Sequence, residues 1–194
     1  MVRAQEGRGG RGHRAARLRA VNGDRYLAVR SALLRDLAEA TSFTGAARKI
    51  LEMVGEGLGW DIACVWRLDP PAGVLRFVLS WHKPGAGESE LERMSARVVF
   101  SPGVGLPGRV LSTGEPAWIS DVQTDRSFPR VSAAAVEGIR GAFGVPILSG
   151  RKFLGVIEFF SHHVRERDDE LLRVMASIGS RLAPFMVRAQ EHGE

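Results

Sequence analysis

Three glycines with the spacing of a dinucleotide-binding loop lie near the middle of the chain. Gly103, Gly105 and Gly108 match G-x-G-x-x-G, and Asp121 follows at about the distance of a ribose-binding acid. Such a loop needs a parallel strand–helix–strand unit around it. Here the preceding strand is about four residues long, and the helix after Pro107 ends by Gly114, too soon for a parallel crossover. We interpret the glycines as turn and helix-start residues.

Cysteine and histidine are the other residues that could carry chemistry. Cys64, the single cysteine, lies in an apolar strand without an adjacent histidine or cation, so we interpret it as buried and structural. His162 and His163 are consecutive strand residues that point to opposite faces and cannot easily share a metal ion. His82 lies at a strand end beside a loop. Since the sequence has no Ser/His/Asp signature, P-loop or HExxH motif, we expect no catalytic residues, no metal site and no enzyme activity.

The composition is that of a globular protein with a basic beginning. Of the 194 residues, 44% are hydrophobic and 25% are charged, and the formal net charge is +5. Residues 1–20 contain six arginines and one acid, so the rest of the chain is neutral, and nucleic-acid binding is not expected. No apolar run is long enough to span a membrane or to form a signal peptide. We therefore expect a cytoplasmic protein, with residues 1–23 as a disordered Arg/Gly-rich tail.

Hydrophobic spacing predicts an α+β domain over residues 24–190. Apolar residues at helical spacing predict helices over 24–40 and from Ser42 or Thr44 to Gly59. Alternating residues then predict strands over 60–68 and 74–81, and a hairpin of 140–148 with 152–161. Short helices are predicted after Pro107 and near 129–137, and residues 83–96 are assigned to a loop. This order favours a mainly antiparallel sheet.

The last predicted helix, about 167–190, carries the most regular pattern. Its apolar residues repeat with spacings of 4 and 3, as in a coiled-coil seam. We expect this seam to pack against the helix of 24–40, a second subunit, or both, and residues 191–194 to form a short tail. The predicted dimer and signalling-helix residues are Leu33, Leu37, Leu171, Met175, Ile178, Leu182 and Phe185.

From Ser101 onward the chain resembles a GAF domain. The resemblance rests on SPGVGLPGRVLSTGEPAWISDVQTDRSFPR, GIRGAFGVPIL and GRKFLGVIEFFS, followed by an acidic turn and a long helix. GWDIACVWRLD and VLRFVLSW resemble the family's first two strands, and the match covers about residues 42–190. It is most similar to the GAF modules of bacterial sensor histidine kinases and related signalling proteins. The resemblance implies a central antiparallel sheet, with the terminal helices on one face and short helices over a possible pocket on the other.

The resemblance also bears on the cofactor, which stays unknown. Where cyclic-nucleotide GAF domains carry Asn-Lys, Phe and Asp-Glu, this chain has Ser161-His162, Val164 and Asp168-Asp169, so cyclic-nucleotide binding is not expected. The chromophore cysteine of bilin-binding relatives is missing after the Gly-Leu-Pro-Gly segment, which argues against a covalent bilin. One cysteine is too few for the reductases of free methionine sulfoxide, and no histidine is clearly placed for haem.

The resemblance leaves two hypotheses for function. In the first, a sensory domain of bacterial signal transduction, such as a two-component system, binds an unidentified small molecule between the sheet and the short helices. It relays the signal through the terminal helices of a homodimer to a kinase or other output domain, in cis or in trans. In the second, the module is a ligand-free dimerisation scaffold between neighbouring domains. The candidate pocket residues are Trp66, Phe77, Phe100, Trp118, Phe128 and Phe143, with Asp121 and Arg130 as polar contacts.

Overall fold

A six-stranded antiparallel sheet divides the protein into two layers of helices. The computed structural model describes residues 9–87 and 89–192, with side chains from residue 22 to 191. The strands are β1 (Ile62–Asp69), β2 (Val74–His82), β3 (Val99–Phe100), β4 (Ala117–Ile119), β5 (Gly141–Ser149) and β6 (Lys152–Ser161). Their order in the sheet is β3-β2-β1-β6-β5-β4, and every pairing is antiparallel. No parallel unit therefore surrounds the G-x-G-x-x-G segment within this sheet.

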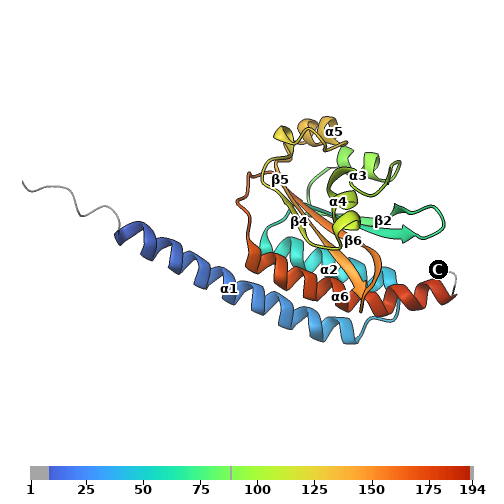
Figure 1. Ribbon diagram of the computed structural model, residues 1–194. Helices are drawn as coiled ribbons and strands as arrows, with labels where there is room; N and C mark the ends of the chain where they lie inside the picture. The colour runs from blue at the N-terminus through green and yellow to red at the C-terminus, as the bar shows by residue number, and fades with distance from the viewer. Residues whose placement is uncertain (1–8, 88, 193–194) are drawn as a thin grey trace, which may run out of the picture.

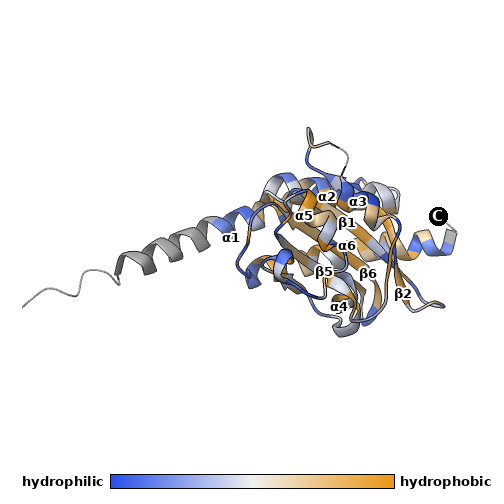
Figure 2. Ribbon diagram, turned by 90° about the horizontal axis from the view of Figure 1, so that it is seen from above, coloured by the Kyte–Doolittle hydropathy of each residue, from blue (hydrophilic) through white to orange (hydrophobic). Residues whose placement is uncertain are grey.

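Three long helices cover one face of the sheet (Figure 1). They are α1 (Gly9–Ala38), α2 (Phe43–Leu58) and α6 (Asp169–His192). Ser42 caps α2 by accepting a hydrogen bond from the Gly45 amide, and Gly59 ends it with a positive φ of 70°. Apolar residues of these helices and of the sheet form one core cluster, and the strands carry most of the hydrophobic colour in Figure 2.

Three short helices cover the opposite face (Figure 1). They are α3 (Glu90–Ser95), α4 (Gly105–Thr113) and α5 (Val131–Val136), and a 3-10 turn (η1, Val122–Thr124) lies between α4 and α5. A second core cluster fills the space between them and the sheet. The sequence predicts a loop over residues 83–96, but α3 forms there. Its sequence signal is short and local. The side chain of Ser89 caps the helix by accepting a hydrogen bond from the Glu92 amide.

The first helix is longer than its sequence pattern predicts. It begins at Gly9 rather than at Asp24, so part of the predicted tail of residues 1–23 is helical. Six of the eight residues 14–21 are Ala or Arg, which propagate a helix well once a following segment is docked. The tail prediction for residues 1–8 lies outside the described residues. At the other end, α6 runs to His192, into the predicted tail of 191–194.

Candidate functional site

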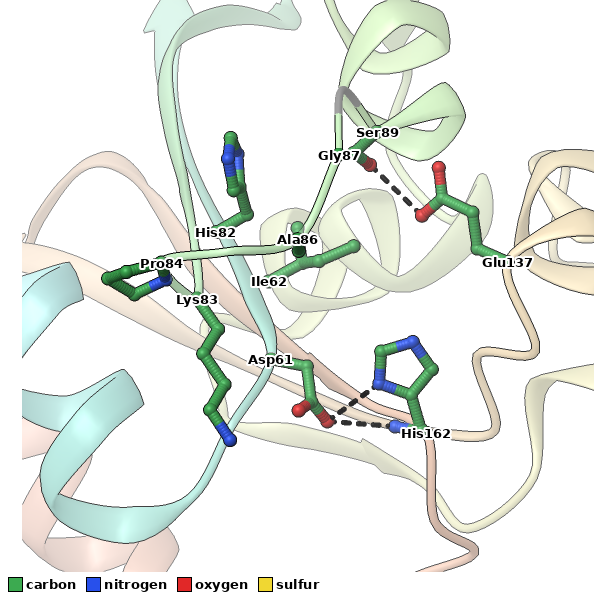
Figure 3. Close-up of a pocket in the computed structure, with 10 residues that line it drawn as sticks. All are labelled: Asp61, Ile62, His82, Lys83, Pro84, Ala86, Gly87, Ser89, Glu137 and His162. Carbon is green, nitrogen blue, oxygen red and sulfur yellow. Dashed lines mark hydrogen bonds and ion pairs between the residues drawn. The ribbon is translucent and has the colours of Figure 1, made fainter.

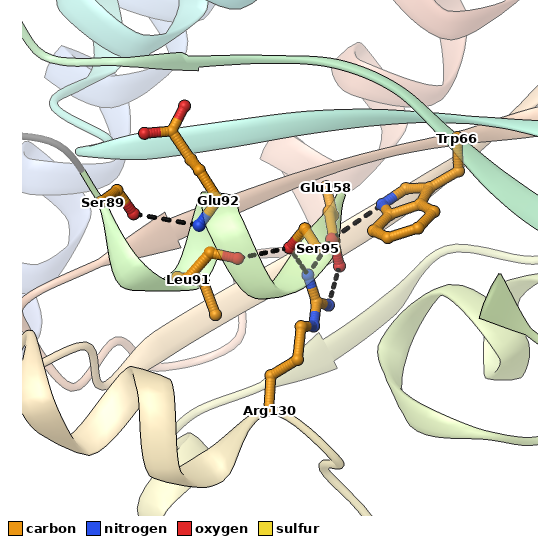
Figure 4. A network of polar contacts seen from close by, with 7 residues as sticks. All are labelled: Trp66, Ser89, Leu91, Glu92, Ser95, Arg130 and Glu158. Carbon is orange, nitrogen blue, oxygen red and sulfur yellow. Dashed lines mark hydrogen bonds and ion pairs between the residues drawn. The ribbon is translucent and has the colours of Figure 1, made fainter. Parts of the chain in front are cut away.

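A fully buried ion pair occupies the middle of the layer under the short helices. Arg130, at the beginning of α5, donates two parallel hydrogen bonds to Glu158 of β6, with Nη1–Oε1 and Nη2–Oε2 distances of 2.7 and 2.8 Å (Figure 4). Both side chains are 0% exposed. Trp66 Nε1 donates to Glu158 Oε1 at 2.8 Å, and Arg130 Nη1 also donates to Ser95 Oγ at 2.8 Å. The guanidinium and the carboxylate therefore have partners on three different elements.

Four aromatic rings surround this guanidinium. Its Cζ lies 4.9 to 5.5 Å from the ring centroids of Phe100, Phe160, Phe128 and Trp66. At these distances the rings attract a cation through their π faces. Arg130 Nε is buried and has no hydrogen-bond partner among the described residues. The site is thus a cation cage with one carboxylate and one unsatisfied N–H.

Five of the eight predicted pocket residues meet at this cage. Trp66, Phe100, Phe128 and Arg130 form it, and Phe77 packs against Trp66 at a centroid distance of 5.6 Å. The other three lie elsewhere. Phe143 and Trp118 stack on each other at 5.6 Å, in the cluster beneath the long helices. Asp121 lies at the surface, where hydrogen bonds from Arg140 lower the pKa of its carboxyl. That the five form a ligand pocket stays a prediction.

Glu158, the residue that organises this cage, is not among the residues predicted from the sequence. Glu158 lies in KFLGVIEFFS, and β6 is buried on both faces from Leu154 to Ser161. A charged residue inside such a run requires a buried partner of opposite charge. Together with Arg130 this signal could have indicated the pair. Cys64, in contrast, is 0% exposed as expected, and burial raises the pKa of its thiol.

A cleft of about 270 Å³ opens at the rim of the same face (Figure 3). We call it the rim cleft. It lies where the beginning of β1 and the ends of β2 and β6 approach the start of α3 and the end of α5. Glu137 accepts hydrogen bonds from Ser89 Oγ and from the Leu91 amide, both at 3.0 Å. The lining residues are Asp61, Ile62, His82, Lys83, Pro84, Ala86, Gly87, Ser89, Glu137 and His162.

Two histidine–carboxylate contacts fix the imidazoles of the rim cleft. Asp61 Oδ2 accepts the His162 amide at 2.9 Å and lies 3.1 Å from His162 Nδ1. His82 Nδ1 lies 2.8 Å from Glu92 Oε2. In Figure 3 the ring of His162 and the carboxylate of Glu137 approach the cleft from the same side, opposite Lys83 and Pro84. The cleft therefore offers the ammonium group of Lys83 and the carboxylates of Asp61 and Glu137 beside apolar side chains.

The residues next to the rim cleft hold the long helices together. Arg165 lies in the connection from β6 to α6, with its Cζ 4.4 Å from the Trp60 ring. It donates to Ser161 Oγ and to the Gly59 carbonyl at the end of α2, and burial lowers its pKa. Three residues further on, Asp168 caps α6 by accepting the amides of Glu170 and Leu171.

Tyr26 joins α1 to the same junction. Its hydroxyl donates to Asp168 Oδ2 at 2.7 Å, and its side chain is 7% exposed. Burial and the neighbouring carboxylate both raise the pKa of the phenol. The beginning of α6 is therefore tied to α1 through Tyr26 and to α2 through Arg165.

The predicted dimer and signalling-helix residues pack against the core of the chain itself. Leu33, Leu37, Leu171, Met175, Ile178 and Leu182 are all at most 7% exposed, and Phe185 packs against the same core cluster. The regular seam of α6 faces the sheet and the neighbouring helices. One of these is α1, which contains the predicted helix of 24–40, one of the partners expected from the sequence. From residue 22 onward, the large apolar side chains of α1 that stay exposed are Leu27 at 53% and Leu34 at 40%.

Comparison with known families identifies the fold. The family model described as "GAF domain" matches residues 40–186, which is most of the chain. The chain belongs to the GAF domain family. No curated protein matches it. GAF domains are mostly regulatory, although some similar structures are enzymes.

Solved GAF structures show the same fold at low sequence identity. The GAF domain of a phosphoenolpyruvate-protein phosphotransferase from Coxiella burnetii is 17% identical, with a TM-score of 0.75 over 89% of this chain and 98% of that one. The free methionine-R-sulfoxide reductase of Neisseria meningitidis, solved with its substrate, is 16% identical, with a TM-score of 0.69 over 86% and 91%. The A. aeolicus nlh2 GAF domain, in an inactive state, is 19% identical, with a TM-score of 0.65 over 84% and 96%.

Within the described residues, no helix is long and apolar enough to cross a membrane.

Proposed function

We propose that this chain is a sensory GAF module of a cytoplasmic bacterial signalling system. In this proposal a small polar molecule binds in the rim cleft, and the terminal helices relay its binding to a kinase or other output domain, in cis or in trans. The observation that carries the proposal is the position of the cleft. Asp61 and His162 line it, and they belong to the α2–β1 and β6–α6 connections.

The chemistry of the rim cleft favours a small molecule that carries both charges. Lys83 and the two imidazoles supply nitrogen groups for an acidic group of the ligand, and Asp61 and Glu137 supply acceptors for an amine. Ile62 and Ala86 add apolar surface. A volume of about 270 Å³ fits a ligand of metabolite size.

A ligand at Asp61 and His162 would act close to the helix junction. Trp60 precedes Asp61, and Arg165 lies three residues after His162 with its guanidinium over the Trp60 ring. Arg165 binds the end of α2, and Asp168 caps the beginning of α6 and accepts the hydroxyl of Tyr26 from the middle of α1. A ligand that favours one arrangement of these connections would shift the population of helix arrangements, which is the basis of relay in a two-state protein.

Native mass spectrometry of the purified protein tests this proposal. We expect extra mass on the folded chain that is lost on denaturation. Ala86→Trp, which fills the rim cleft, should abolish the extra mass. Ala72→Trp, in the exposed turn at the other end of the β1–β2 hairpin, should retain it. Extra mass that persists in Ala86→Trp would mean that the ligand binds elsewhere, and would refute binding in the rim cleft.

A ligand-free scaffold is the second candidate function. The observation that favours it is the burial of the cage under the short helices, where four rings surround Arg130 and both members of its ion pair are 0% exposed. Bare dimers of the wild type and of both variants in the same spectra would favour this function over the sensory one.

A further inference from the structure

The cage around Arg130 has two parts that come from different elements. Trp66 of β1, Phe100 of β3 and Glu158 and Phe160 of β6 belong to the sheet, and Ser95 ends α3. Arg130 and Phe128 belong to the segment that leads into α5. The sheet side is therefore a complete site, with a carboxylate, an indole N–H beside it and three ring faces. The guanidinium that fills it arrives from outside the sheet.

The geometry of the sheet side selects one kind of cation. The two oxygens of Glu158 accept two parallel N–H bonds, at 2.7 and 2.8 Å from Nη1 and Nη2. Only a planar fork such as guanidinium or amidinium makes this pair of bonds, whereas an ammonium is a point donor. The ring faces at 4.9 to 5.5 Å add attraction for a flat, weakly hydrated cation.

The α5 helix itself packs few side chains against the rest of the protein. Of the six residues of α5, only Ala133 and Ala134 are buried, while Val136 is 79% exposed. At its end, Glu137 accepts the Ser89 and Leu91 hydrogen bonds at the rim. Arg130 itself keeps a buried Nε without a partner. Because the two alanines bury little apolar surface, α5 is held chiefly from its flanks, by Phe128 and the Arg130 ion pair before the helix and by Glu137 and the buried Ile139 after it.

We propose that the sheet side of this cage is a binding site for guanidinium-type ligands and that Arg130 is its tethered occupant. A free ligand with a guanidinium or amidinium group and a short stem takes the place of the Arg130 side chain, and α5 then moves off the sheet. This site is separate from the rim cleft, and the inference does not depend on the cleft binding a ligand. It adds a second, cation-specific input to the module.

Emptying the cage tests the site directly. In Arg130→Ala, methylguanidinium chloride at millimolar concentration should bind with saturation in calorimetry and raise the melting temperature by about 5 °C. Methylammonium chloride at the same ionic strength should bind at least about tenfold more weakly, since it cannot form the paired bonds. The matched control is Arg130→Ala with Glu158→Gln, in which the difference between the two cations should disappear. Equal binding of both cations to Arg130→Ala would overturn the proposal.

The wild-type protein tests displacement, even if Arg130→Ala does not fold. We expect methylguanidinium to accelerate amide hydrogen exchange in residues 131–138 more than methylammonium does, with the core amides of α2 unchanged. Exchange in 131–138 that is the same with both cations would show that Arg130 is a fixed structural residue and that no ligand displaces it.

Discussion

At the scale of single residues, the buried pair of Arg130 and Glu158 dominates the short-helix layer. Removing two charges from water costs several kcal/mol per ion, so the pair stabilises the fold only while both members are present. Its partners, Trp66 and Ser95, satisfy further hydrogen-bonding positions. The pair is therefore a point at which a single substitution leaves an uncompensated charge.

Glu158→Gln should be far more damaging than the loss of a surface pair. We expect it to lower the free energy of unfolding by about 3–5 kcal/mol, because Arg130 stays buried without a carboxylate. Replacing both residues with methionine should cost less than this single change. Urea unfolding of the two variants measures the difference. The control is Asp121→Asn, which breaks the exposed pair with Arg140 and should leave stability nearly unchanged. A double variant less stable than Glu158→Gln would contradict this account.

Tyr26 provides a residue-level prediction with a pH dependence. Tyr26→Phe removes the hydrogen bond to Asp168 and should cost about 1–2 kcal/mol near neutral pH. Because the folded protein raises the pKa of the phenol above its ordinary value of 10.0, the protonated form is the one that stabilises the fold. That contribution is complete below pH 10 and decreases by up to about 1.4 kcal/mol per unit as the pH rises above it.

Unfolding of the wild type and of Tyr26→Phe at pH 8 and pH 11 checks the direction of this pH dependence. The two proteins should differ at pH 8 and converge at pH 11. A difference that grows with pH would mean that the phenol is not held in its protonated form.

At the scale of elements, α6 lies very close to the sheet. A Cβ built on Gly179 would lie 2.6 Å from the Pro146 carbonyl oxygen of β5. Glycine is thus required here by close approach and not by its backbone angles. The same helix presents its apolar seam to the core, so its distance from the sheet sets how that seam packs.

Gly179→Ala should therefore destabilise, although alanine is the better helix former. The propensity gain is about 1 kcal/mol, and the overlap with a backbone oxygen should cost about 1–3 kcal/mol or more. Gly23→Ala in α1 is the matched control. Its Cβ would meet only the end of the flexible Glu170 side chain, so this change should be neutral or stabilising. Thermal unfolding of both variants measures the two changes in stability. A stabilised Gly179→Ala would contradict the close approach of α6 to β5.

Elements with long periodic patterns could be predicted from the sequence, whereas the pairing of distant residues could not. The strands, α2 and α6 follow from alternation, helical spacing and caps at Ser42 and Gly59. The α3 helix was missed because six residues give too short a periodic signal. Phe143 was assigned to the wrong face for a related reason: β5 is buried on both faces, so its pattern does not tell one layer from the other.

At the scale of the whole molecule, the exposed helix surface that a second copy of the chain could contact differs from the predicted apolar seam. Leu171, Met175, Ile178 and Leu182 of that seam, together with Leu33 and Leu37, are buried within the chain, and Phe185 is partly buried against the same cluster. On α1, Leu27 and Leu34 are seven residues apart and stay exposed, with the exposed Ser31 between them. Seven residues correspond to two helical turns, so the two leucines lie on one face of α1. If the module dimerises through its terminal helices, this face offers exposed apolar surface among the described side chains of α1.

We therefore expect Leu27→Glu with Leu34→Glu to produce monomers where the wild type forms dimers. Each substitution places a charge opposite its own copy in a symmetric contact, while the intrachain core is untouched. Sedimentation equilibrium over a tenfold concentration range measures the change, and circular dichroism verifies the fold. Val136→Glu is the control, because Val136 is more exposed but lies on α5, on the opposite face of the sheet. A dimer that survives the double substitution but not Val136→Glu would place the interface on the short-helix face. Both the helix relay and the scaffold function would then lose their structural basis.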